Sequence, residues 1–167
     1  HLFLRFDSET EESSKNSLYI KKSQGELDTS TIDSLGYDVY LGHTQAPTSS
    51  ERDFNADTSH PFQYKDWIVA HNGILSNFTH LKEKFYPEWD NKVDSSIIPV
   101  VLQEYGEADL SKALDELEGT FGIWAYNKNS KKIYIARSGS TLFALPDMSC
   151  TFSSIEFPDS TSLPEHV

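Results

Sequence analysis

The sequence predicts an α+β domain built as a four-layer αββα sandwich, with two mainly antiparallel sheets between layers of helices. The segments 120–127 (TFGIWAYN) and 131–138 (KKIYIARS) are apolar on both faces, which is typical of strands in a sheet covered on both sides. The chain order of strands, then helices, then strands again is typical of a layered α+β fold. A length of 167 residues is enough for a sizeable core, so we expect one domain over 1–167.

Short strands and polar connections are predicted for the first part of the chain. Residues 2–6 (LFLRF) either finish a helix or form a short strand, and 18–22 (LYIKK) predict a strand. In 37–43 (YDVYLGH) the apolar residues alternate, which predicts another strand. The segment 46–65 is rich in turn-forming residues, so we expect a long loop there, and loops of this length are usually functional or disordered. A further strand is predicted at 66–71 (DWIVAH).

The segment 69–77 (VAHNGILSN) runs from this strand into an Asn-Gly pair. Between two strands, such a pair would be an ordinary hairpin turn. Residues 78–85 have helical spacing of apolar side chains instead, so the sequence predicts a strand-to-helix corner with Ser76 as the helix N-cap. The corner would present the Asn72 side-chain amide and the Gly73 N–H, and two converging donors are what an oxyanion hole needs. A purely structural corner is the alternative.

Two helices and a set of strands are predicted after the corner. The first helix begins at Asp94, and Pro99 should distort it because proline removes one internal hydrogen bond. The second spans 108–119, with Asp109 as a possible cap and Gly119 as its end. The strands that follow, of which the first two should form a hairpin, are 120–127, 131–138, 141–145 and 150–157.

Composition and charge exclude several classes of function. The chain has 26 acidic and 14 basic residues, a net charge of -12, which would repel a phosphate backbone, so we expect no nucleic-acid partner. No apolar run has the length to span a bilayer, so we expect no membrane partner. The single Cys150 permits no internal disulfide, which fits a reducing compartment, and we expect a cytoplasmic protein. The six histidines show no ligand spacing, so neither a metal site nor a cofactor is predicted.

Four segments, taken in their order along the chain, resemble the glutaminase domain of class II glutamine amidotransferases, the N-terminal-nucleophile type. They are GHTQAPTS (42–49), VAHNGILSN (69–77), VDSSIIPVVL (93–102) and GTFGIWAYNKNSKKIYIARS (119–138). The resemblance covers roughly residues 8–157. It implies the fold of N-terminal-nucleophile hydrolases and chemistry on the side-chain amide of glutamine or a related small amide.

The resemblance also implies roles for the residues that match. The Asn72 side chain and the Gly73 N–H would form the oxyanion hole for amide hydrolysis. Asp94 would accept hydrogen bonds from the substrate's α-ammonium group, with a simple helix cap as the alternative, and Thr48 would line the glutamine pocket. Gln45 stands where the family has an arginine that holds the substrate's α-carboxylate, and a neutral amide gives weaker hydrogen bonds than a charged group.

The family's nucleophile is an N-terminal cysteine whose own α-amino group acts as the base. The sequence begins at His1, so we expect that cysteine and the first strand to lie upstream, and Cys150 to be a core thiol. His43 and His71 are expected to be packed scaffold residues. Two functions stay open: a glutamine-hydrolysing domain that releases ammonia to a synthetase or transferase domain, and a catalytically inactive domain with a structural or assembly role in a larger complex.

Overall fold

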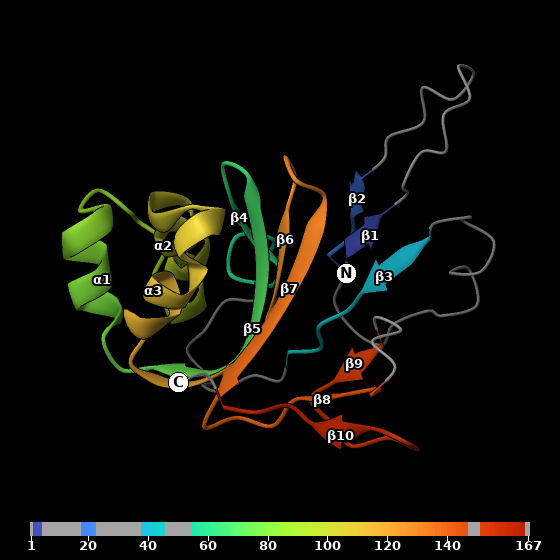
Figure 1. Ribbon diagram of the computed structural model, residues 1–167. Coiled ribbons are helices and arrows are strands. Elements are labelled where there is room, and N and C mark those ends of the chain that lie inside the picture. The colour runs from blue at the N-terminus through green and yellow to red at the C-terminus, as the bar shows by residue number, and fades with distance from the viewer. Residues whose placement is uncertain (1, 5–17, 23–37, 46–54, 147–150, 166–167) are drawn as a thin grey trace, which may run out of the picture. The chain divides into compact units, whose positions relative to one another are not determined.

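The structure is a computed structural model, and it describes residues 2–4, 18–22, 38–45, 55–146 and 151–165 (Figure 1). The chain forms two compact units, His1–Pro61 and Phe62–Val167. Thr48 and Cys150 lie outside the described residues. The expectation of a single domain over the whole chain stays a prediction.

The first unit contains a three-stranded antiparallel sheet. In it, β1 (Leu2–Leu4) lies between β2 (Leu18–Ile20) and β3 (Val39–Leu41). The two strands predicted in this part of the sequence are therefore confirmed. The first apolar segment, for which helix and strand were both open, contains a strand.

The second unit is built on a four-stranded antiparallel sheet with the strand order β4-β5-β6-β7 (Figure 1). Its long central strands, β5 (Trp67–Leu75) and β6 (Gly119–Asn127), pair along their whole length. The outer strands are β4 (Phe62–Tyr64) and β7 (Lys132–Ser138), and β6 and β7 form the predicted hairpin. The loop prediction was wrong at its C-terminal end, because β4 lies there and pairs with β5.

A small antiparallel sheet completes the second unit. Its order is β10-β8-β9, formed by β8 (Phe143–Ala144), β9 (Phe152–Ser153) and β10 (Thr161–Ser162). The strands β8 and β9 fall within the last two predicted strands and are shorter. The sequence does not predict β10, because its two residues are both polar and both exposed and so show no apolar alternation.

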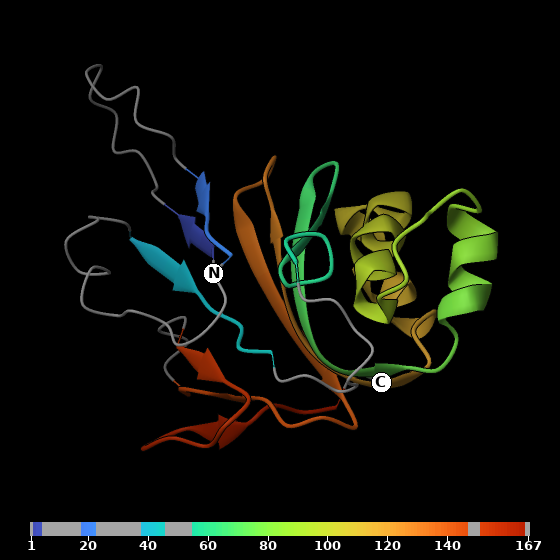
Figure 2. The same ribbon diagram turned by 180° about the vertical axis from the view of Figure 1, so that it is seen from behind.

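Helices cover one face of the four-stranded sheet (Figures 1 and 2). They are α1 (Phe78–Phe85), the 3₁₀ turn η2 (Asp94–Ile97) that leads into α2 (Ile98–Tyr105), and the 3₁₀ turn η3 (Glu107–Asp109) that leads into α3 (Leu110–Asp115). The α-helices and η2 fall in segments for which the sequence predicts helix, and η3 begins one residue before the helix predicted for 108–119. The α+β class with antiparallel sheets is thus confirmed.

Two predicted helix boundaries were wrong. The N-cap of α1 is Asn77 rather than Ser76, whose hydroxyl instead donates to the Glu118 carbonyl at 3.2 Å. The third helix ends at Asp115, and Gly119 is the first residue of β6 rather than the end of the helix. In both places the pairing of β5 with β6 continues further than the local sequence indicates.

Asp94, Pro99 and Asp109 all lie at the beginnings of helical segments. Asp94 begins η2, and Pro99 lies in the first turn of α2, where a helix needs no N–H donor. The segment changes from the 3₁₀ turn η2 to the α-helix at Ile98, directly before the proline. Asp109 is the N-cap of α3, but its side chain makes no capping hydrogen bond.

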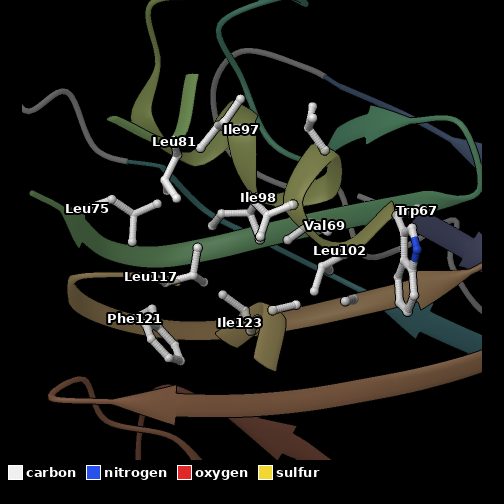
Figure 3. Packing of buried hydrophobic residues seen from close by; sticks show 14 residues of the cluster. Trp67, Val69, Leu75, Leu81, Ile97, Ile98, Leu102, Leu117, Phe121 and Ile123 are labelled. Carbon is white, nitrogen blue, oxygen red and sulfur yellow. The ribbon is translucent and has the colours of Figure 1, made fainter. Parts of the chain in front are cut away.

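The hydrophobic core of the second unit lies between the four-stranded sheet and its helices (Figure 3). Its labelled members come from β5, β6, the helical segments and the connection between α3 and β6: Trp67, Val69, Leu75, Leu81, Ile97, Ile98, Leu102, Leu117, Phe121 and Ile123. The strand residues that alternate with these are buried as well, namely Ile68, Ala70, Trp124 and Tyr126. The prediction of strands with both faces covered, made for 120–127 and 131–138, is therefore confirmed for β6, whereas most residues of β7 are only half buried. Among the described residues, no helix combines the length and the apolar character needed to cross a membrane.

Candidate active site

Asn72 and Gly73 lie inside strand β5 and not at a corner after it. They pair with Gly122 and Phe121 of β6, and β5 continues to Leu75 before the chain turns toward α1 (Figure 1). The predicted end of the strand at residue 71 was therefore wrong. Pairing with β6 keeps Asn72 and Gly73 in the strand, although an Asn-Gly pair locally favours a turn.

Glycine is required at position 73. Its φ is +147°, and a Cβ atom there would lie 2.0 Å from the Thr120 carbonyl oxygen and 2.8 Å from Nε2 of His71. The backbone of β6 and the His71 ring thus close directly on the Gly73 main chain. No side chain fits this position unless the two strands move apart.

The segment 72–74 is the exposed part of β5. His71 and Leu75, on either side, are buried, while Asn72, Gly73 and Ile74 are exposed, with Ile74 70% exposed. Exposed residues between two buried anchors are a suitable place for groups that meet a ligand, although the Ile74 N–H already donates to the Thr120 hydroxyl at 3.3 Å.

The Asn72 main chain is also held from the loop between β7 and β8. The Ser140 hydroxyl donates to the Asn72 carbonyl at 3.1 Å. Arg137 of β7 in turn donates to the Ser140 carbonyl at 2.8 Å and to the Leu163 carbonyl at 2.6 Å. Arg137 also forms an ion pair of 2.8 Å with Glu165, so a charged side chain supports the loop that holds Asn72.

Asp94 lies at the same end of β5. Its Oδ2 accepts a hydrogen bond from the Leu75 N–H at 2.9 Å, and its Oδ1 is 3.4 Å from the Ser95 hydroxyl. The carboxylate thus bonds to a neighbouring strand instead of only capping its own helix. Asp94 thus contacts the end of β5 at which Asn72 and Gly73 lie, and a shared role of the three residues stays a prediction.

His71 links the same strand to η2 from inside the unit. Its side chain is 2% exposed, with Nδ1 2.8 Å from Oγ of Ser95 and Nε2 3.1 Å from the Thr120 carbonyl oxygen. A carbonyl only accepts, so we assign the hydrogen to Nε2 and make Nδ1 the acceptor for the Ser95 hydroxyl. Burial lowers the pKa of His71, although the hydrogen bond to Thr120 and the charge of Asp94 act in the opposite direction.

The other two predicted pocket residues belong to the first unit. Oε1 of Gln45 is 3.0 Å from Nδ1 of His60, and the His60 ring lies against His43 with ring centroids 4.1 Å apart. Thr48 lies outside the described residues. A shared pocket of Gln45 and Thr48 with Asp94 stays a prediction. Within the described ranges, no cluster of three or more His, Cys, Asp or Glu side chains is placed to hold a metal ion.

Sequence comparisons identify similar proteins. The family model for the glutamine amidotransferase domain matches residues 6–142. The chain is 30% identical to 7-cyano-7-deazaguanine synthase 2 of Sulfurisphaera tokodaii over 115 residues, which are 65% of this chain and 25% of that protein. It is 32% identical to glutamine–fructose-6-phosphate aminotransferase (isomerizing) of Thermococcus kodakarensis over 145 residues, 75% of this chain and 23% of that protein. The chain thus spans about a quarter of the length of these relatives.

Proposed function

The chain belongs to the glutamine amidotransferase domain family, and on this basis we propose that it is a class II glutaminase domain that hydrolyses the side-chain amide of glutamine or a related amide. The observation that supports the proposal most is that Asn72 and Gly73 are exposed two to three residues before Leu75, whose N–H donates to the Asp94 carboxylate. Hydrogen-bond donors beside a carboxylate suit a ligand that carries both a carbonyl and a cationic amine.

In the proposed reaction, the nucleophile is the N-terminal cysteine that the resemblance implies for the mature protein. Its thiolate attacks the amide carbon of glutamine, and its α-amino group carries the proton to the departing ammonia. The Asn72 amide and the Gly73 N–H stabilise the oxyanion of the tetrahedral intermediate, and Asp94 accepts hydrogen bonds from the substrate's α-ammonium group. Water then releases glutamate and restores the cysteine.

The remaining parts of the proposal concern the fold, the pocket and the partner. We infer the four-layer sandwich of N-terminal-nucleophile hydrolases, with Thr48 lining the pocket and Gln45 facing the substrate's carboxylate. The relatives are a synthase and an aminotransferase by name, and the chain spans about a quarter of each. We therefore propose that a synthetase or transferase domain, in the same or another cytoplasmic chain, receives the ammonia.

One observation favours a second candidate function. Gln45 carries no charge at the position where the resemblance implies an arginine, and its Oε1 atom is engaged by His60. A pocket without a charged clamp holds a carboxylate less firmly. The alternative is a catalytically inactive domain of the same fold that serves a structural role in a larger assembly.

Ammonia release from glutamine by the complete gene product tests the proposal. We expect Asn72→Ala to lower the turnover about a hundred- to thousandfold, because removal of one oxyanion-hole donor typically has this effect. Asn129→Ala, in the exposed β6–β7 turn, is the matched control and should leave turnover unchanged. Turnover that survives Asn72→Ala would refute the assignment, and a complete protein without any turnover would favour the inactive alternative.

A further inference from the structure

The exposed segment 72–74 is tied at both ends to the start of η2. Before the segment, Nδ1 of His71 lies 2.8 Å from Oγ of Ser95. After the segment, the Leu75 N–H donates to Oδ2 of Asp94 at 2.9 Å. Two neighbouring residues of η2 thus fix the two ends of the segment, and the carboxylate of Asp94 is part of this frame.

The direction of the hydrogen bonds in this frame depends on the proton of His71. In the neutral ring, Nε2–H donates to the Thr120 carbonyl and Nδ1 accepts from the Ser95 hydroxyl. The single hydroxyl hydrogen of Ser95 is then used, so it is not available to Oδ1 of Asp94 at 3.4 Å. A proton taken from solvent onto Nδ1 reverses the bond, because Nδ1–H then donates to Ser95 and the hydroxyl hydrogen turns toward Asp94.

Among the described residues, few charged groups act on the His71 ring. The two groups hydrogen-bonded to the ring are Ser95 of η2 and Thr120 of β6, and both are neutral. The charge that acts on His71 is that of Asp94 on η2. A positive charge on His71 and a cationic ligand therefore both interact with the carboxylate of Asp94.

We propose that His71 is a positioning residue of this site: its neutral form holds segment 72–74 and leaves Asp94 to accept a cationic amine, and its protonated form turns the Ser95 hydroxyl onto Asp94. The proposal rests on the proposed function for the identity of the amine, which is the α-ammonium group of glutamine. By linkage, protonation of His71 weakens amine binding at Asp94, and a bound amine weakens protonation of His71 to the same extent.

The sign of the pH dependence follows from the lowered pKa of His71. Above the ordinary histidine range the ring is neutral in both the folded and unfolded chain. As the pH falls from about 6.5, the unfolded chain takes up the proton first, so stability decreases until the pH has passed the pKa of the folded state. Amine binding should decrease over the lower part of the same range, where the folded protein is protonated.

Nitrogen NMR of the full chain with labelled histidine tests the frame without any ligand. We expect His71 to carry its hydrogen on Nε2 at pH 7.5 and to titrate below pH 6.5, since that value is the ordinary pKa of a histidine. In Asp94→Asn its midpoint should move lower still, because the attraction of the carboxylate is lost. A hydrogen on Nδ1, or an unchanged midpoint in Asp94→Asn, would overturn the proposal.

The Ser95 link is tested by a matched pair of variants. Ser95→Ala should change the Nδ1 resonance of His71 and its midpoint, Ser95→Thr should restore both, and Ser111→Ala on the exposed face of α3 should change neither. If Ser95→Ala and Ser111→Ala give the same His71 titration, the relay through Ser95 does not exist. These measurements also separate positioning from a merely structural role, which would not affect the tautomer.

A pair of ligands tests the link to the amine. Glutamine should lower the midpoint of His71, whereas glutaramic acid, which keeps the amide and one carboxylate but lacks the ammonium group, should not. Equal shifts with both ligands would overturn the link. If neither ligand binds at any pH, the proposed glutaminase function fails, while the ligand-free titrations still decide whether His71 forms the frame.

Discussion

The two ends of strand β5 pair with the same partner strand but are held in different ways. From Trp67 to Ala70 every residue is at most 1% exposed, and the side chains are fixed by burial on both faces. From His71 to Leu75 the exposed segment 72–74 lies between two buried residues. The segment and these two residues are fixed by hydrogen bonds with Thr120, Ser140 and the start of η2.

The buried end of β5 stabilises the fold, whereas the hydrogen-bonded end positions the groups that we propose for ligand binding. Apolar burial has no preferred direction, so it holds the strand in the sheet without fixing the position of any single polar atom. Hydrogen bonds are directional, and several of them on one short segment fix where its donors point. Truncation of a large buried side chain should therefore lower stability strongly, whereas removal of one of these hydrogen bonds should alter ligand binding for a smaller loss of stability.

The largest effect on folding is expected at the buried end. Trp67→Ala should lower the free energy of unfolding by about 3–5 kcal/mol, because it leaves a cavity in the core. Ile155→Ala, at a position 75% exposed, is the matched control and should stay within about 0.5 kcal/mol. Urea unfolding measures both. A loss below about 1 kcal/mol for Trp67→Ala would show that burial does not hold this end.

A pair of glycines tests the close approach at the polar end. Gly73 and Gly106 both have positive φ, but a Cβ at Gly106 meets nothing within 4 Å, whereas at Gly73 it would overlap the Thr120 carbonyl. Both alanine variants carry backbone strain of about 1–3 kcal/mol, and Gly73→Ala should add about 1–3 kcal/mol for the overlap. Equal unfolding free energies for the two variants would contradict the close approach.

The sequence predicts the two ends of β5 with different success. The buried end follows from a local apolar run, which is the strongest signal that a single sequence carries. At the other end the resemblance identifies Asn72 and Gly73, but the strand end placed before them was wrong, because an Asn-Gly pair is a strong local turn signal. The partners Ser95, Thr120 and Ser140 were missed, since they lie 24, 49 and 68 positions from the residues they bond.

Binding measurements on a Gln45 variant test whether the polar end of β5 takes part in glutamine binding. An amide at Gln45 supplies two uncharged donors, whereas arginine offers five in a rigid fork. We expect free glutamine to bind the native chain weakly, in the millimolar range, and Gln45→Arg to tighten binding about ten- to a hundredfold, which is roughly 1.5–3 kcal/mol. Calorimetry on both proteins measures this. Tight binding by the native chain would refute the clamp argument, and no binding by either would support the inactive alternative.

The smallest effect is expected for the hydrogen bond that holds the Asn72 carbonyl. Ser140→Ala removes the donor at 3.1 Å, and because the carbonyl lies on an exposed segment, water replaces the lost partner. We expect the free energy of unfolding to fall by only about 0.5–1.5 kcal/mol. In the complete protein, turnover should fall while the KM for glutamine stays nearly constant, because the segment that faces the oxyanion is loosened and Asp94 is not. Ser111→Ala is again the control. If Ser140→Ala raised KM and left turnover unchanged, the loop would act on substrate binding, and the division of roles along the polar end of β5 would be wrong.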